Sequence, residues 1–252
     1  MKILSLFSSV VIACAFLVGC SYNPGVPLVP GKTIPAGAGS TYIYSNTPID
    51  TTGKLLTDST YFTVDSVAAA GTTYSGKTNV TRFSIRNTKT GVVTLSYINF
   101  ETNGDISEYV GGSLLSFLGI HLPDWVTYPM QTHTSYGSVI FDTTFNFPVP
   151  VVGTVPIHIV VSDSITYQNW DLFSLNNASI PQFNLSHKTN YNGVAKSFVD
   201  VSIFNSDALT TLSFAPSLGY YTKRTTQPFK VPLGVFPSLQ GSQKILTAYN
   251  LK

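Results

Sequence analysis

The segment from Val155 to Tyr167 limits the fold more than any other part of the chain. Apolar and polar residues alternate along it over thirteen positions. Period-two alternation indicates a long β-strand with one buried and one wet face, and such strands are typical of antiparallel sheets. Val160 and Asp163 interrupt the alternation, so we expect a bulge or a polar spot close to them. The segment therefore predicts one long strand of an antiparallel sheet.

The rest of the chain beyond residue 40 has a similar composition: runs of Thr, Ser, Tyr, Phe, Val and Ile lie between closely spaced Gly and Asn residues. Such runs predict short strands joined by turns. Further strands are expected at residues 59–67, 79–86, 92–100, 139–147, 195–204, 209–214 and 244–249. Residues 112–120 differ, and they predict one or two helical turns or a buried strand. We predict a mostly-β fold with a single antiparallel domain over residues 41–252, with a domain break near residues 121–135 as the alternative.

The first 19 residues have the pattern of an export signal. Lys2 is followed by the nearly uncharged apolar run from Ile3 to Val18, which ends at Gly19 and Cys20. The sequence Leu-Val-Gly-Cys at this point resembles the lipobox of bacterial lipoproteins. The resemblance implies that residues 1–19 are removed and that Cys20 carries a diacylglyceryl group. A transmembrane anchor or a different cleavage site is the alternative, although the run is shorter than the roughly 20 residues that a span prefers.

A lipid anchor implies a protein of the bacterial cell envelope whose globular part lies outside the bilayer. Ser21 follows the cysteine, and by lipoprotein sorting rules this favours the outer membrane, with the face of the membrane left open. Residues 20–40 contain four prolines and several glycines. Such a stretch forms neither a helix nor a central strand, so it is expected to be a tether between the anchor and the domain.

The composition excludes several classes of protein. Only 10% of the residues are charged and the formal net charge is +2, which excludes a nucleic-acid binder of the basic-patch kind. An aromatic content of 13% argues against a disordered chain. Both cysteines, Cys14 and Cys20, lie at the start of the sequence, so neither a disulfide framework nor a cysteine metal site is expected.

Motifs for catalysis are missing from the sequence. It contains no zinc-binding HExxH, no G-x-S-x-G, no phosphate-binding P-loop and no G-x-G-x-x-G. We therefore predict a protein that is not an enzyme, with no metal site, no cofactor and no assigned catalytic residue. His158 falls on the wet face of its strand. A hydrolytic role would need a pocket in which at least two of His121, His133, His187 and the aspartates converge.

Aromatic residues are frequent in the less regular segments. Large rigid rings line apolar ligand cavities or stack on sugars, although rings also simply fill a core. The candidate ligand-lining residues are Trp125, Tyr128, Trp170, Phe173, Phe214 and Tyr220.

Five aspartates are followed by Ser or Thr and then by a small or aliphatic residue. This tripeptide resembles the acceptor motif for periplasmic O-glycosylation in Bacteroidetes. The alternative is that Asp opens turns while Ser and Thr fill strands. The candidate glycan acceptors are Thr51, Ser59, Ser66, Thr143 and Ser164.

The run Phe-Ala-Pro-Ser-Leu-Gly at residues 214–219, followed by Lys223 and Arg224, resembles a segment of uncharacterised Bacteroidetes-type envelope lipoproteins. The layout is similar to the half-barrel of lipoprotein-carrier proteins, in which a strongly curved antiparallel sheet wraps an apolar cavity. The resemblance thus implies a half-barrel, and a β-sandwich is the alternative architecture. The resemblance implies a non-enzymatic lipoprotein that binds an apolar or amphipathic ligand, such as a lipid or an acyl chain. The first alternative is a structural or interaction module that contacts an envelope protein or a glycan, and the second is a hydrolytic enzyme.

Overall fold

The computed structural model describes residues 36–111, 122–130, 135–149, 153–196, 199–229 and 238–252. These residues form twelve strands and one short 3-10 helix. The elements are β1 (Thr41–Ile49), η1 (Thr57–Ser59), β2 (Tyr61–Tyr74), β3 (Lys77–Asn87), β4 (Val93–Phe100), β5 (Ile106–Tyr109), β6 (Trp125–Tyr128), β7 (Tyr136–Val149), β8 (Gly153–Leu175), β9 (Ala178–Ala195), β10 (Val201–Ala215), β11 (Tyr220–Thr226) and β12 (Gly241–Asn250). The described chain is therefore almost entirely β-structure.

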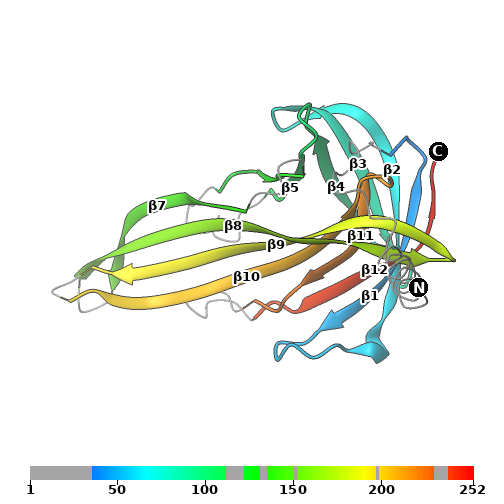
Figure 1. Ribbon diagram of the computed structural model, residues 1–252. Helices are drawn as coiled ribbons and strands as arrows, with labels where there is room; N and C mark the ends of the chain where they lie inside the picture. The colour runs from blue at the N-terminus through cyan, green and yellow to red at the C-terminus, as the bar shows by residue number, and fades with distance from the viewer. Residues whose placement is uncertain (1–35, 112–121, 131–134, 150–152, 197–198, 230–237) are drawn as a thin grey trace, which may run out of the picture.

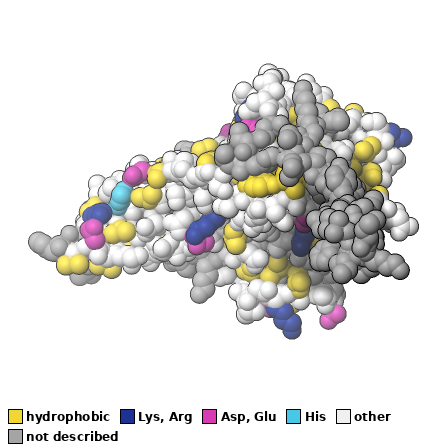
Figure 2. Space-filling model, viewed as in Figure 1, with side chains coloured by type: hydrophobic (Ala, Val, Ile, Leu, Met, Phe, Trp, Pro, Cys, Tyr) yellow, Lys and Arg dark blue, Asp and Glu magenta, His cyan; other side chains and the backbone are white. Residues whose placement is uncertain are grey.

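All twelve strands belong to one sheet with the order β6-β5-β4-β3-β2-β1-β12-β11-β10-β9-β8-β7. Every neighbouring pair is antiparallel. We call β2–β6 the wing and β7–β10 the arm. In Figure 1 the arm extends to the left as a long twisted ribbon, while most of the wing stands at the upper right, and Figure 2 shows the same view as a space-filling model. The central strands β1, β12 and β11 join the two parts.

The predicted mostly-β, antiparallel fold is confirmed, but both predicted architectures are wrong for the described residues. A β-sandwich needs two sheets, whereas hydrogen bonds run without interruption through β1 and β12. The half-barrel needs a strongly curled sheet, whereas this sheet is open and its edge strands β6 and β7 do not pair. The reason lies in strand length. β8 has 23 residues and β6 has four, so at about 3.3 Å per residue the arm runs far beyond the wing.

Strand β8 confirms the alternation seen in the sequence. Ile157, Ile159, Val161 and Ile165 are buried on one face of the strand. Asp163 belongs to the same series, so it forms the predicted polar spot on the inward face. The register between β7 and β8 also shifts between Val139 and Phe141, opposite this part of β8. The polar spot therefore lies at the interruption itself, and the bulge lies on the neighbouring strand β7, opposite it.

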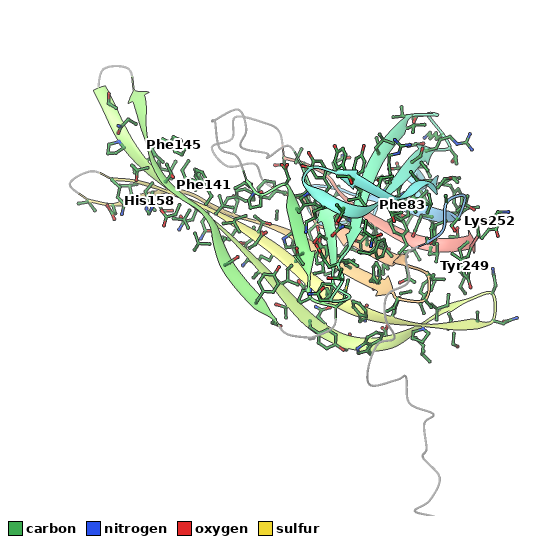
Figure 3. All side chains as sticks on the ribbon, turned by 90° about the horizontal axis from the view of Figure 1, so that it is seen from above. Phe83, Phe141, Phe145, His158, Tyr249 and Lys252 are labelled. Carbon is green, nitrogen blue, oxygen red and sulfur yellow. The ribbon has the colours of Figure 1, made fainter. Side chains whose placement is uncertain are left out.

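The main core lies between the wing, the central strands and the near part of β8–β10. Its centre is a group of buried rings in which Phe83 stacks on Tyr220 with a centroid distance of 4.2 Å, and Tyr42 packs against both. A second apolar cluster lies on the arm around Ile159, with Phe141 and Phe145 packed against it. Figure 3 shows Phe83 in the wing and these two phenylalanines far out on the arm.

One predicted strand is wrong. Residues 195–204 do not form one strand, because β9 ends at Ala195 and β10 begins at Val201. The chain turns back between them, and Ala195 pairs with Val201. Residues 112–120 lie outside the described residues, so their predicted turn or strand is not described. Among the described residues, none belongs to a helix long and apolar enough to cross a membrane.

Candidate functional site

A pocket of about 450 Å³ lies between the end of the wing and the arm, and we call it the wing–arm pocket. The wing contributes residues of β6 and of the segments before it, and the arm contributes residues of β7, β8 and β9. Its apolar side chains are Val110, Leu122, Pro123, Val126 and Ile140. Ile140 is the extra residue at the register shift of β7, and such a bulge re-aims a side chain.

The polar part of the pocket comes from two paired strands of the arm. Asp163 on β8 lies opposite Thr189 on β9, and Ile165 lies opposite His187. Thr189 Oγ1 donates a hydrogen bond to Asp163 Oδ1 at 2.6 Å, and His187 Nε2 lies 3.2 Å from the same oxygen. The side chains of Asp163 and His187 are only 13% and 12% exposed. A fixed polar cluster is therefore built into an otherwise apolar wall.

The cluster keeps Asp163 ionised. Burial of this carboxyl favours its neutral form, but the hydrogen bonds from His187 and Thr189 and the charge of the imidazole outweigh burial and hold the pKa of Asp163 below its usual value. The described part of the lining therefore holds one carboxylate, that of Asp163, with His187 as its partner and no Lys or Arg.

The geometry of His187 limits what the cluster can do chemically. Its Nε2 faces both Asp163 Oδ1 and, at 3.4 Å, Thr189 Oγ1. A base in a nucleophilic triad uses one ring nitrogen for the carboxylate and the other for the nucleophile. Here Nε2 alone faces both the carboxylate of Asp163 and the hydroxyl of Thr189. If Nε2 carries the proton, it donates to the carboxylate. The hydroxyl of Thr189 donates to the same carboxylate and not to the imidazole. This arrangement suits ligand binding better than activation of Thr189 as a nucleophile.

Three aromatic side chains complete the pocket: Trp125 on β6, Tyr136 on β7 and Tyr191 on β9. The hydroxyl of Tyr136 donates to the carbonyl oxygen of Thr127 at 2.6 Å, so one ring links the arm to the wing. Tyr191 is buried, and its pKa is raised to about 12, first by burial and then by Asp163. Both hydroxyl groups therefore stay protonated at neutral pH.

A second titratable cluster lies in the core, away from this pocket, and we call it the buried charge centre: Asp65, Glu108, Arg224 and Lys244. Asp65 on β2 pairs with Lys244 on β12, and Glu108 on β5 pairs with Arg224 on β11. A cavity of only about 50 Å³ lies beside Glu108, Arg224 and Lys244. The two acids and two bases balance, so the centre binds the wing to the central strands rather than attracting a charged ligand.

Tyrosine hydroxyls complete the hydrogen bonding of this centre. Tyr128 and Tyr221 each donate to Glu108 Oε2 at 3.4 Å. Burial, and then the nearby charge of Glu108, raise the pKa of both tyrosines well above the usual value, so they remain donors. Tyr128 also packs edge-on against His187 with a centroid distance of 5.9 Å. The charge centre thus supports the wall of the wing–arm pocket from behind.

Of the six predicted ligand-lining rings, one lines the pocket and the other five lie behind it, in the main core or against that core. Trp125 lines the wing–arm pocket, and Tyr128 lies directly behind it. Phe214 and Tyr220 are buried in the main core, and Trp170 and Phe173 pack against that core. Tyr136 and Tyr191, which line the pocket, were not among the predicted rings.

The candidate glycan acceptors also differ in exposure. Thr51, Ser59 and Thr143 are exposed, whereas Ser66 and Ser164 are half-buried in strands. The hydroxyl of Ser164 donates to the carbonyl oxygen of Lys188. The exposed three are therefore the better placed for an enzyme that adds a sugar.

Other predicted residues lie outside the pocket or outside the described chain. His158 pairs with Asp142 at 2.6 Å on the exposed side of the arm. Cys20, His121 and His133 lie outside the described residues, as do the predicted signal and most of the predicted tether. Within the part of the chain that is described, no group of three or more His, Cys, Asp or Glu side chains could hold a metal ion.

Strand β9 carries two of the three residues of the polar cluster, His187 and Thr189, and it was not predicted from the sequence. The signal is a period-two series of inward residues from Phe183 through Leu185, His187 and Thr189 to Tyr191. Two polar residues in the middle of this series hide the alternation, and Pro181 near its start is usually a sign against a strand. The alternation of β9 becomes visible only if two polar residues are allowed on its inward face.

No protein-family model matches the chain, and no curated protein matches it. Among solved structures, the fold is similar to that of a protein from Bacteroides fragilis, described as exported and of YmcC-like fold, with a TM-score of 0.38 and 10% identity over 86% of this chain and 98% of that one. It is also similar to a protein from Parabacteroides distasonis, described as a lipoprotein, with a TM-score of 0.39 and 11% identity over 88% of this chain and 99% of the other.

Proposed function

We propose that this protein is a non-enzymatic lipoprotein of the bacterial cell envelope that binds a small amphipathic ligand in the wing–arm pocket. The observation that carries the proposal is the division of the pocket wall into an apolar part around Val126 and Ile140 and a polar cluster around Asp163. A volume of about 450 Å³ falls within the range typical of small-molecule sites. A ligand with an apolar body and one polar end matches such a wall.

The envelope location rests on the sequence of the N-terminus. Acylation at Cys20 would hold the domain at a membrane, with the outer membrane favoured by Ser21. A protein held beside a bilayer meets lipids and acylated molecules at high local concentration. An amphipathic ligand is thus one that the anchored domain would encounter.

The proposal predicts that filling the pocket abolishes binding. Ile140→Trp adds an indole to the wall of the pocket and is expected to weaken the binding of N-phenyl-1-naphthylamine, a neutral apolar dye, at least about tenfold, because a filled pocket has no room for the dye. The measurement is a fluorescence titration of the purified protein held in amphipol, against a blank of amphipol alone.

The matched control is Val139→Trp. Val139 is the preceding residue on β7, is 59% exposed and does not line the pocket. This variant is expected to bind the dye as the unchanged protein does. Equal affinity in Ile140→Trp and the unchanged protein, or no saturable binding by the unchanged protein, would overturn the proposal.

Strand pairing with a partner is a second candidate function. β7 has 14 residues and one neighbour in the described sheet, so much of its other edge offers backbone groups for hydrogen bonding. Such an edge can accept a strand from another envelope protein. A photo-crosslinking amino acid at the exposed Thr143 should then give one discrete adduct in living cells, and the same label at the exposed Thr90 should not.

A further inference from the structure

We infer that the polar end of the ligand in the wing–arm pocket is an organic cation, such as a substituted ammonium group. This inference rests on the proposed function and adds the chemical class of the ligand. It follows from three properties of the pocket: its charge, its aromatic residues and the absence of a competing cation among the described lining residues.

The charge is fixed by Asp163. Its carboxylate lies on the pocket wall, and the two groups hydrogen-bonded to it, His187 and Thr189, stand beside it on β9. Both of these contacts go to Oδ1. They hold the carboxylate in one orientation, and of the two only His187 can carry a positive charge. An anionic head group, such as a free fatty acid, would be placed against this charge and would be repelled.

The nearest basic residue along β9 is engaged elsewhere. Lys188 lies between His187 and Thr189 in sequence, and successive side chains of a strand point to opposite faces. Its Nζ pairs with Asp207 at 2.9 Å, and both side chains are nearly half exposed. The carboxylate of Asp163 is therefore not paired with the neighbouring lysine.

The aromatic residues supply the second part of the recognition. Trp125, Tyr136 and Tyr191 come from three different strands and line the same pocket as Asp163. Faces of aromatic rings attract cations, most strongly where water is excluded, and sets of rings around an alkylated ammonium group are a recurrent solution. The ring of Trp125 already has Lys77 Nζ 5.7 Å from its centroid, so recognition of a ligand rests on Tyr136 and Tyr191. A carboxylate with these two rings distinguishes a cation from a neutral molecule of the same shape.

Three probes with the same six-carbon chain test the inference: hexyltrimethylammonium, hexanol and hexanoate. Isothermal titration of the protein is expected to show the cation binding at least about tenfold more tightly than hexanol, with hexanoate binding more weakly than either. Asp163→Asn should reduce the preference for the cation to below about threefold, because the amide keeps the shape and loses the charge.

A second pair of variants tests the contribution of an aromatic ring and shows whether the pocket is still folded. Tyr136→Leu keeps the pocket apolar but removes a ring, so it should weaken the cation and leave hexanol unchanged. Tyr136→Phe keeps the ring, so it should retain the preference. Hexanol binding equal to that of the unchanged protein shows in each variant that the pocket is intact.

The outcomes are distinguishable from failure of the proposed function. If hexanol or hexanoate binds as tightly as the cation, or if the naphthylamine dye binds and none of the hexyl probes does, the ligand is not an organic cation, while the pocket remains a binding site. If neither the dye nor any hexyl probe binds, both the proposed function and this inference fail.

Discussion

Replacing Asp65 by alanine is expected to lower the free energy of unfolding by about 3–5 kcal/mol, because it leaves a buried charge without its partner. The side chain of Asp65 is fully buried and that of Lys244 is 18% exposed. Asp65 also accepts a hydrogen bond from the hydroxyl of Tyr220 at 3.0 Å. Its removal would leave Lys244 with the ring of Tyr44, 4.4 Å away, and the weaker attraction of Glu108 in place of its paired carboxylate. Urea unfolding followed by circular dichroism measures the loss.

The matched control is Asp200→Ala. Asp200 pairs with Lys196 on the surface, where the two side chains are 57% and 42% exposed, so the expected cost is below about 1 kcal/mol. A second check is the double replacement Asp65→Leu with Lys244→Met, which should recover most of the stability because no charge remains buried. Equal losses in Asp65→Ala and Asp200→Ala would contradict the prediction.

The effect of Asp65→Ala should also depend on pH in a defined direction. Burial lowers the pKa of Lys244 below 10.5, and Asp65 opposes this effect. Without Asp65 the folded-state pKa falls further below the unfolded one, so the unfolded chain binds more protons and stability rises with pH. The difference in stability between the variant and the unchanged protein should therefore shrink as pH rises from neutral toward 10.5, the usual pKa of lysine.

Phe83→Ala is expected to cost a similar amount, about 3–5 kcal/mol, for a different reason. Phe83 is fully buried, stacks on Tyr220 and packs against Tyr42. The replacement leaves a cavity between the wing and the central strands, which large neighbouring rings cannot fill without leaving their own packing. The unfolding midpoint in urea is the measurement.

Phe62→Ala is the control for this prediction. Phe62 lies on β2, next to the strand that carries Phe83, and it is 49% exposed. Its removal leaves no closed cavity, so the expected cost is below about 1 kcal/mol. A small effect of Phe83→Ala would mean that the core can collapse around the missing ring.

The sequence predicted the class of the fold because alternation is a local property. β8 was found from its inward series of Ile157, Ile159, Val161 and Ile165, and the interruption at Asp163 pointed to the polar spot that now lies in the pocket wall. β1 and β9 were not predicted, because their apolar faces are interrupted by polar residues such as Asn46 and Thr189.

The architecture and most of the site could not be predicted, because they depend on contacts between distant residues. The partners Asp65 and Lys244 are 179 positions apart, and nothing in the local pattern near either one identifies the other. The pocket also depends on contacts between distant residues. Trp125 and Tyr191 lie on strands whose sequences do not indicate a site, and they line the same pocket as Asp163 only because the wing and the arm come together. The length of the arm is the feature that argues against a half-barrel. It could not be predicted from the sequence, because β9 was not recognised as a strand.

The pairing of the first and last strands has a consequence for biogenesis. β1 and β12 are neighbours along nine consecutive residues of β1, from Thr41↔Asn250 to Ile49↔Gly241. The ladders on either side can form from hairpins, but the seam between them needs the C-terminal segment, and such distant pairings are slow to form. Assembly of the native molecule therefore finishes only after strand β12 has been synthesised. Until then the polypeptide stays incompletely folded, which, under the lipoprotein proposal, is the condition in which a translocation channel would thread it.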